Sequence, residues 1–191
     1  MMNRINDIQG LLRTVAASFL EPGDVVVDAT AGRGRDTLFL AHAVGKTGQV
    51  FAFDIQPQAL AETQHLLSEA GCAGQVKLIL ADHARMDDYI ENKVKAIVFN
   101  LGYLPGSDHL TVTLPHSTRA AIQAGLKLLK PGGLMVLTLY RGHSGALEEA
   151  LTVEEETSAL SKKNFSVLKG CYINQEDTAP YWILVQKHRE D

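Results

Sequence analysis

The stretch "VVVDATAGRGRDTLFLA", from Val25 to Ala41, decides the fold class of this 191-residue chain. Three β-branched valines lead into an aspartate, then a glycine-rich bend, then an apolar segment with helical spacing. This pattern predicts a strand that feeds a helix through a turn built for close approach of a ligand to the backbone. Because the first N–H groups of a helix have no acceptor within the helix, they can bind a ligand, and such a turn suits phosphates or a nucleoside.

The composition is that of an ordinary globular protein, with 46% hydrophobic and 21% charged residues. We expect one domain over residues 1–191, long enough to bury roughly 70% of the surface of its unfolded form. Within it we expect an N-terminal helix over residues 1–22 and a cofactor-binding core over 23–140. A helix and an antiparallel hairpin are expected over residues 141–191.

We expect neither a targeting segment nor a membrane span in this sequence. The N-terminal stretch contains Asp7 and Gln9, has no long apolar core and shows no small-residue cleavage pattern, so we expect no signal peptide. No uncharged apolar run reaches the roughly 18 residues of a spanning helix, so we expect no membrane association. Cys72 and Cys171 lie far apart and form no CxxC pair, which favours reduced thiols and a cytoplasmic location.

Charge and histidine spacing narrow the function classes. A formal net charge of −4 argues against a general nucleic-acid binder, because neutralising phosphates requires an excess of Lys and Arg on at least one face. The seven histidines show no HExxH or Cys/His ligand spacing, so we expect no metal site. "GKT" at 45–47 and "GHSG" at 142–145 lack the further glycines of a phosphate-binding loop and a hydrolase elbow.

Strand and helix patterns alternate along most of the chain, which implies crossover helices and a parallel sheet. After the first strand, strands are expected at 48–55, 75–82, 93–102 and 134–140, and helices at 57–70, 116–129 and 146–162, with "KPGG" ending the second of these helices. The last two strands, 165–173 and 180–187, are separated only by "NQEDTA". This connection is too short for a parallel crossover, so an antiparallel hairpin is expected. An α/β fold with helices on both faces of a seven-stranded, mostly parallel sheet and one reversed strand resembles the Rossmann-like, class I methyltransferases that use S-adenosylmethionine.

The acid before the glycine turn favours this cofactor over a nicotinamide dinucleotide. "AGRGRD" nearly matches the dinucleotide fingerprint, but Asp36 stands where a small residue is needed. Asp28, in "DATAGRG", resembles the lead acid of the first methyltransferase motif, and it would repel a diphosphate but suit a cationic sulfonium. Asp54 ends the second strand about 20 residues past the glycines, where it can accept both ribose hydroxyls. A tight turn without any ligand is the alternative interpretation of the glycines.

Neighbouring residues complete the expected cofactor site. Ile55 and Gln56 would flank the adenine, and Asp82 or His83 would read its amino group. Asp36 and Thr37 either contact the amino-acid tail or only cap the helix. We expect S-adenosylmethionine to be bound by Asp28, Thr30, Gly32, Arg33, Gly34, Asp36, Thr37, Asp54, Ile55, Gln56, Asp82, His83 and Asn100.

The fourth strand ends in "FNLGYLPG", where many amine-directed methyltransferases carry Asn/Asp-Pro-Pro-aromatic. "NLGY" resembles that motif without its prolines. The Asn100 amide oxygen and a backbone carbonyl would accept hydrogen bonds from an amine, and Tyr103 would stack on the substrate. Asp108 and His143, on loops beyond strand ends, are candidate proton acceptors. The alternative is that Asn100 only shapes a turn at the strand end.

Several strings together resemble one narrower family. "DATAGRGRDT", "FDIQ", "FNLGYLPGSD", "YRGH" and "YINQ" are similar to the MnmM-type family, long labelled rRNA methylases. The resemblance implies S-adenosylmethionine as donor, the anticodon region of tRNA as partner, and the alkyl amine of 5-aminomethyl-2-thiouridine at the wobble position as acceptor. Arg33 and Arg35 depart from the smaller residues usual in that family's turn, and with Arg141 they offer phosphate contacts.

Other functions remain open on the sequence. The acidic charge favours a methyltransferase of a small-molecule amine or hydroxyl, and rRNA is another candidate acceptor. A module that binds the cofactor without catalysis is the alternative from a different class. A homodimer is compatible with the sequence, which does not determine the oligomeric state.

Overall fold

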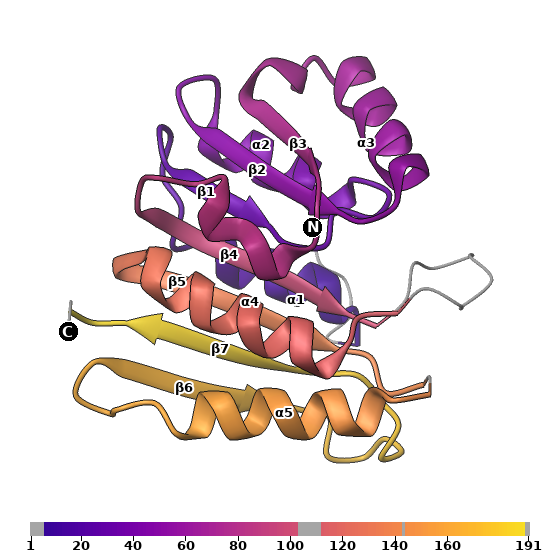
Figure 1. Cartoon of the computed structure of the whole chain (residues 1–191), viewed down its shortest axis with the longest axis vertical. Coiled ribbons are helices and arrows are strands. Elements are labelled where there is room, and N and C mark those ends of the chain that lie inside the picture. The colour runs from indigo at the N-terminus through magenta and orange to yellow at the C-terminus, as the bar shows by residue number, and fades with distance from the viewer. Residues whose placement is uncertain (1–5, 103–111, 143, 190–191) are drawn as a thin grey trace.

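The computed structural model describes residues 6–102, 112–142 and 144–189. In that part of the chain, helices cover both faces of one seven-stranded sheet (Figure 1). The strands are β1 (Val25–Asp28), β2 (Gln49–Asp54), β3 (Val76–Leu80), β4 (Val94–Leu101), β5 (Leu129–Leu139), β6 (Phe165–Gly170) and β7 (Tyr181–Lys187). The helices are α1 (Ile8–Ala17), α2 (Arg35–Val44), α3 (Pro57–Glu69), α4 (Pro115–Leu128) and α5 (Ala146–Ser158), with short 3-10 helices η1 (Ala73–Gln75) and η2 (His83–Asp88).

The strand order is β3-β2-β1-β4-β5-β7-β6. The first five strands pair in parallel, whereas β7 is inserted between β5 and β6 and runs antiparallel to both. The predicted seven-stranded, mostly parallel sheet with one reversed strand is confirmed. The chain order reverses between β1 and β4, and open α/β sheets bind ligands beside such a reversal, at the carboxyl ends of the strands.

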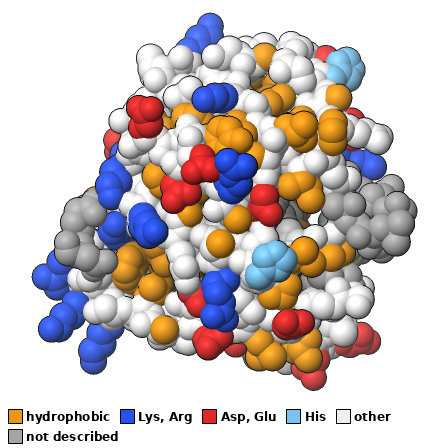
Figure 2. All heavy atoms as spheres, in the orientation of Figure 1, with side chains coloured by type: hydrophobic (Ala, Val, Ile, Leu, Met, Phe, Trp, Pro, Cys, Tyr) orange, Lys and Arg blue, Asp and Glu red, His pale blue; other side chains and the backbone are white. Residues whose placement is uncertain are grey.

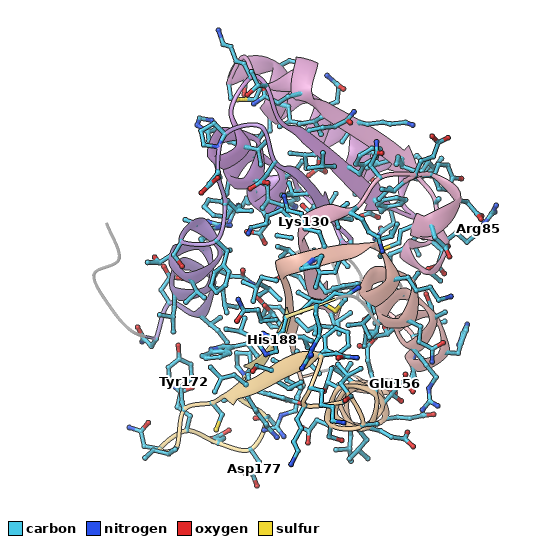
Figure 3. All side chains as sticks on the ribbon, turned by 90° about the vertical axis from the view of Figure 1, so that its left-hand side faces the viewer. Arg85, Lys130, Glu156, Tyr172, Asp177 and His188 are labelled. Carbon is cyan, nitrogen blue, oxygen red and sulfur yellow. The ribbon has the colours of Figure 1, made fainter. Side chains whose placement is uncertain are left out.

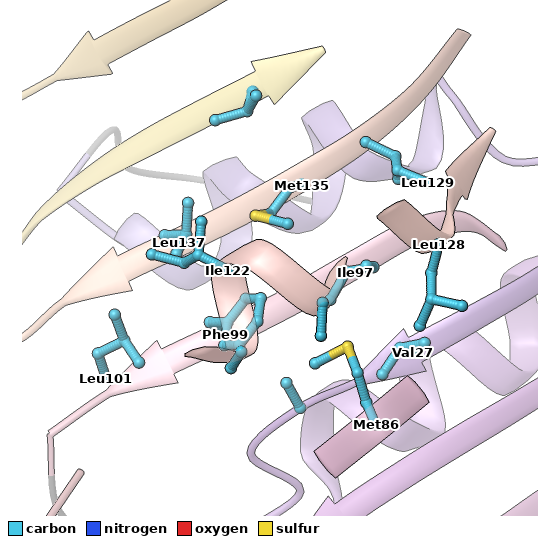
Figure 4. Packing of buried hydrophobic residues seen from close by; sticks show 14 of the residues in the cluster. Val27, Met86, Ile97, Phe99, Leu101, Ile122, Leu128, Leu129, Met135 and Leu137 are labelled. Atoms are coloured by element: carbon cyan, nitrogen blue, oxygen red, sulfur yellow. The ribbon is translucent and has the colours of Figure 1, made fainter. Parts of the chain in front are cut away.

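Two hydrophobic clusters, one on each face, hold the helices on the sheet. One packs α4, α5 and η2 against the strands and contains Phe99, Ile122 and Leu137 (Figure 4). The other lies beneath α1, α2 and α3 and contains Leu12 and Leu40. Burying each such side chain stabilises the fold by roughly 1.5–3 kcal/mol. Since both faces are covered, a central strand such as β4 is apolar along almost its whole length.

The break between α4 and β5 differs from the prediction. The sequence predicts that "KPGG" at 130–133 separates a helix from a strand that begins at 134. In the structure β5 already begins at Leu129, and "KPGG" lies inside it, where the register with β4 shifts between Val94 and Ala96. Pro131 has no N–H to donate, and Gly132 has a φ of +73°, so this segment interrupts the regular ladder without ending the strand.

Two C-terminal boundaries also differ. α5 ends at Ser158 instead of residue 162, and the chain turns soon afterwards, where the Asn164 N–H donates to the Ser161 carbonyl at 2.9 Å. β6 ends at Gly170 instead of residue 173, because its ladder with β7 stops opposite Trp182. The Trp182 ring takes the space of a side chain there, since a Cβ on Gly170 would lie 2.0 Å from it.

The surface carries both signs of charge. On the face in Figure 2, many Lys and Arg side chains lie toward the left edge. Over the rest of this face, acidic and basic side chains are mixed. Figure 3 looks onto that edge and labels Lys130, which pairs with Asp24 at 2.8 Å. Among the described helices, none is both long and apolar enough to cross a membrane.

Candidate functional site

A cavity of about 790 Å³ opens at the carboxyl ends of the parallel strands, beside the reversal between β1 and β4. Its volume lies in the range of cofactor and small-molecule sites. Its walls come from the loops after β1, β2, β3, β4 and β5 and from α1. The residues of the predicted cofactor set that line it are Thr30, Gly32, Arg33, Asp36, Asp54, Ile55, Gln56, Asp82, His83 and Asn100.

The glycine turn after β1 is held rigidly against α3. Gly34 has a φ of +77°, a region that L side chains rarely adopt. A Cβ at Gly34 would lie 2.8 Å from a methyl group of Thr63, whose hydroxyl donates to the Gly32 carbonyl at 2.9 Å. The second glycine of the turn is therefore required for close packing as well as for its backbone conformation.

Asp54, at the end of β2, is oriented by two backbone donors. Its oxygens accept hydrogen bonds from the N–H groups of Gly32 at 2.8 Å and Gln56 at 2.9 Å. An ionised carboxylate offers about four acceptor positions, so these two bonds leave capacity on both oxygens. Asp54 can therefore accept two vicinal hydroxyls, the chemistry expected of a ribose-binding acid.

Asp28, the last residue of β1, lies behind the cavity wall. It is fully buried, and its carboxyl group accepts a hydrogen bond from the Thr37 hydroxyl at 2.6 Å and one from the Thr30 N–H at 3.2 Å. Burial and the nearby Asp36 carboxylate raise the pKa of Asp28 to about 7, although the two hydrogen bonds act in the opposite direction. Asp28 and Thr37 secure α2 on β1, and these two residues and Gly34 do not line the cavity.

Asp82 and His83, at the start of η2, are joined by a serine from α4. Asp82 accepts hydrogen bonds from the Ser117 hydroxyl at 2.6 Å and the Ala84 N–H at 2.8 Å. Partial burial of Asp82 is outweighed by these bonds, and its pKa is lowered. Burial lowers the pKa of His83, whose Nδ1 lies 3.1 Å from the Ala29 carbonyl. Of the two, Asp82 presents the charged acceptor to the cavity.

Asn100 stands at the centre of a polar network. Its side-chain amide donates to Asp36 at 2.7 Å, and its side-chain oxygen accepts from Gln9 at 2.6 Å. Arg13 pairs with the other oxygen of Asp36 at 2.7 Å. Gln9 also donates to the Tyr140 hydroxyl at 2.5 Å. The network joins α1, α2, β4 and the end of β5 at one corner of the cavity.

Three predicted catalytic residues, Tyr103, Asp108 and His143, lie outside the described residues. The two sides of the segment that contains Tyr103 and Asp108 meet at Gly102 and Thr113. The N–H of each donates to the other residue, with Gly102 bonding to the Thr113 hydroxyl at 2.8 Å and Thr113 to the Gly102 carbonyl at 2.9 Å. Within the described residues, no group of three His, Cys, Asp or Glu side chains is arranged to hold a metal ion.

The sequence analysis missed the site residues Gln9, Arg13, Ser117 and Tyr140, all of which line the cavity. Gln9 and Arg13 are four positions apart, so both face the same side of α1. This polar pair was the available signal in the N-terminal helix, to which the sequence assigns no site residue. Ser117 carried no comparable signal, since its role depends on where α4 meets η2.

The strand order, the reversed β7 and the cavity at the reversal, with an acid after β2, define the fold of the class I, Rossmann-like methyltransferases. Within that class, the chain belongs to the family described as "Putative rRNA methylase", whose model matches residues 50–186. The family resemblance inferred from the short sequence strings is confirmed.

Known relatives cover most of the chain. A chloroplastic tRNA (mnm(5)s(2)U34)-methyltransferase from Arabidopsis thaliana is 39% identical over 166 residues, which is 82% of this chain but 61% of the relative. The crystal structure of a putative rRNA-methylase from Clostridium thermocellum has a TM-score of 0.93 and 38% identity, covering 98% of this chain and 100% of that one. A putative methyltransferase from Streptococcus mutans, solved in complex with SAH, has a TM-score of 0.86 and 31% identity, covering 98% and 99% of the two chains.

Proposed function

We propose that this protein transfers a methyl group from S-adenosylmethionine to the alkyl amine of 5-aminomethyl-2-thiouridine at the wobble position of tRNA. The observation that carries the proposal is the Asn100 carboxamide, which is held between Asp36 and Gln9 in the same cavity as the Asp54 carboxylate. The modified wobble nucleoside in the name of the Arabidopsis relative, mnm(5)s(2)U34, supports the acceptor, because it is the methylated form of the proposed amine. The SAH in the Streptococcus mutans structure supports the donor.

The cavity residues fit the cofactor. Asp54 has acceptor capacity for two ribose hydroxyls, and Ile55 is a half-exposed apolar side chain beside it on the cavity wall, suited to pack on adenine. Asp82 is a charged acceptor for the adenine amino group. The cofactor supplies a methyl group on a positively charged sulfur, which leaves as a neutral thioether.

The chain's part in the reaction is to bind and align the neutral amine. The amine nitrogen forms a bond to the methyl carbon while the carbon–sulfur bond breaks, and the sulfur keeps that electron pair. The methylated nitrogen then loses a proton to water or to a nearby base. Asn100 would accept a hydrogen bond from the amine and so direct its lone pair toward the methyl group. Alignment of this kind contributes up to about 7–11 kcal/mol to a two-reactant step.

The cellular setting is part of the proposal. Both cysteines, Cys72 and Cys171, are free, in keeping with a reducing compartment such as the cytoplasm.

A second candidate function is methyl transfer to a small-molecule amine or hydroxyl. The net charge of −4 favours this candidate, because a negatively charged protein is less suited to bind RNA phosphates.

The test is a methyl-transfer assay with several acceptors. The protein is incubated with S-adenosylmethionine and tRNA carrying 5-aminomethyl-2-thiouridine, and digested nucleosides are weighed by mass spectrometry. We expect that nucleoside to gain one methyl group, and tRNA without the aminomethyl group to stay unchanged because it lacks the nucleophile. Parallel reactions contain rRNA and a metabolite extract. Methylation only in the extract would replace the tRNA proposal with the small-molecule candidate.

A further inference from the structure

One nitrogen atom links two polar groups of the cavity. The Gln9 side-chain amide donates both of its hydrogens, one to the Asn100 side-chain oxygen at 2.6 Å and one to the Tyr140 hydroxyl oxygen at 2.5 Å. All three residues line the cavity. The Gln9 amide therefore sets how the other two groups face the cavity.

The Asn100 carboxamide can adopt only one orientation in this network. Its nitrogen faces Asp36, whose carboxylate oxygens accept hydrogen bonds, and its oxygen faces the Gln9 amide, which donates. A carboxamide oxygen accepts two hydrogen bonds, so one position remains open after Gln9 is bound. Gln9 thus keeps a hydrogen-bond acceptor on Asn100 available in the cavity.

Tyr140 presents the opposite chemistry. Its oxygen already accepts from Gln9, and among the described residues no acceptor is bonded to its hydroxyl hydrogen. Burial raises the pKa of Tyr140, so the hydroxyl stays protonated and able to donate. The cavity therefore contains an acceptor on Asn100 and a donor on Tyr140. Because both lie close to the same nitrogen, they are no more than about 5 Å apart.

We propose that this pair recognises a primary amine held one carbon away from a ring whose adjacent carbon bears a carbonyl. Asn100 accepts from the amine, Tyr140 donates to the ring carbonyl and so determines specificity, and Gln9 is the positioning residue for both. This inference rests on the proposed function and deepens it. An isolated alkyl amine would satisfy only half of the pair, whereas a 5-aminomethyl pyrimidine satisfies both halves.

A purely structural role for Gln9 would give different results. If Gln9 only fastened α1 to the sheet, its loss would lower the free energy of unfolding without changing which acceptor is bound. The test therefore measures discrimination between two acceptors, which a purely structural role would leave unchanged.

The experiment uses two RNA stem-loops, one carrying 5-aminomethyluridine and one carrying uridine at the same position. Their affinities for the SAH-saturated protein are measured by fluorescence anisotropy, and calorimetry gives the affinity for SAH. The variants are Tyr140→Phe and Gln9→Met, which keep side-chain size but remove the donors. The matched controls are Tyr89→Phe, at the end of η2, and Gln64→Met, on the exposed side of α3, both outside the cavity lining.

We expect Tyr140→Phe to weaken binding of both stem-loops roughly tenfold, because both rings carry the carbonyl. Gln9→Met should remove most of the preference for the aminomethyl stem-loop, because the Asn100 amide is then free to turn. Tyr140→Phe should leave the affinity for SAH unchanged, because Tyr140 is not among the residues expected to bind the cofactor, and the controls should match the parent protein. If the Gln9→Met chain does not fold, the affinities of Tyr140→Phe for the two stem-loops alone decide whether the recognition pair stands.

The outcomes separate this inference from the proposed function. Variant stem-loop affinities equal to those of the controls would overturn the recognition pair, even if the parent protein methylates tRNA. Failure of the parent protein to bind either stem-loop would overturn it too. If the expected affinity changes appear but the parent protein transfers no methyl group to the aminomethyl nucleoside, the recognition pair stands and the proposed function falls.

Discussion

Replacing Gly34 with alanine should destabilise the protein much more than the same change at Gly71. Both glycines have a positive φ, +77° and +68°, so each alanine incurs the left-handed penalty of about 1–2 kcal/mol. A Cβ at Gly34 would lie 2.8 Å from the Thr63 methyl carbon and 3.0 Å from the Thr63 Cα, whereas a Cβ at Gly71 meets nothing within 4 Å. The clash at Gly34 involves backbone and a hydrogen-bonded side chain, so it cannot be relieved by a rotamer change. Overpacking of this kind costs about 1–3 kcal/mol more.

Urea denaturation of the two variants and the parent protein measures this difference, with the free energy of unfolding obtained by linear extrapolation. We expect Gly34→Ala to lose about 2–5 kcal/mol and Gly71→Ala about 1–2 kcal/mol. Adding Thr63→Ala to Gly34→Ala should recover part of the loss, since it removes the methyl group and hydroxyl that the new Cβ meets. Equal losses at Gly34 and Gly71, or strictly additive losses in the double variant, would refute the close-packing argument.

Three further predictions concern the acids and the amide of the site. The pKa of Asp28 is raised to about 7 in the folded protein, so between about pH 4 and 7 only the folded state keeps a proton on this carboxyl group. The free energy of unfolding should therefore fall as the pH rises through this range. Asp28→Asn should remove that fall in urea titrations, and an unchanged pH profile in the variant would contradict the prediction. Asp54→Ala should remove most of the affinity for S-adenosylmethionine in calorimetry, whereas Asp88→Ala, an exposed acid paired with Arg85, should not. Asn100→Ala should lower kcat far more than it weakens cofactor binding, because its bond to the amine matters mainly at the reaction geometry. Equal losses in both quantities would assign Asn100 a structural role.

The amino-acid sequence by itself determined the order of elements and the type of sheet. Strand-length apolar runs that alternate with helical patterns require crossovers, and the six residues of "NQEDTA" permit only a hairpin. The acids that end β1 and β2 could also be identified in the sequence, because each directly follows an apolar strand-length run. They were expected at one site because the carboxyl ends of parallel strands meet at one edge of the sheet. These features depend on residues close together in the chain, which is why local periodicity and spacing predict them.

Only the tertiary structure decided what each of these polar residues does. Asp28 and Asp54 both end strands, yet Asp28 is buried beneath α2 while Asp54 faces the cavity, because α2 crosses over the end of β1 and places Thr37 on Asp28. Gln9 reaches Asn100 across 91 positions of sequence. Such contacts arise from how helices pack on the sheet, and the sequence around either residue does not predict its partner. The sequence therefore determined where the cavity lies, and long-range packing decided which side chains enter it and how they are oriented.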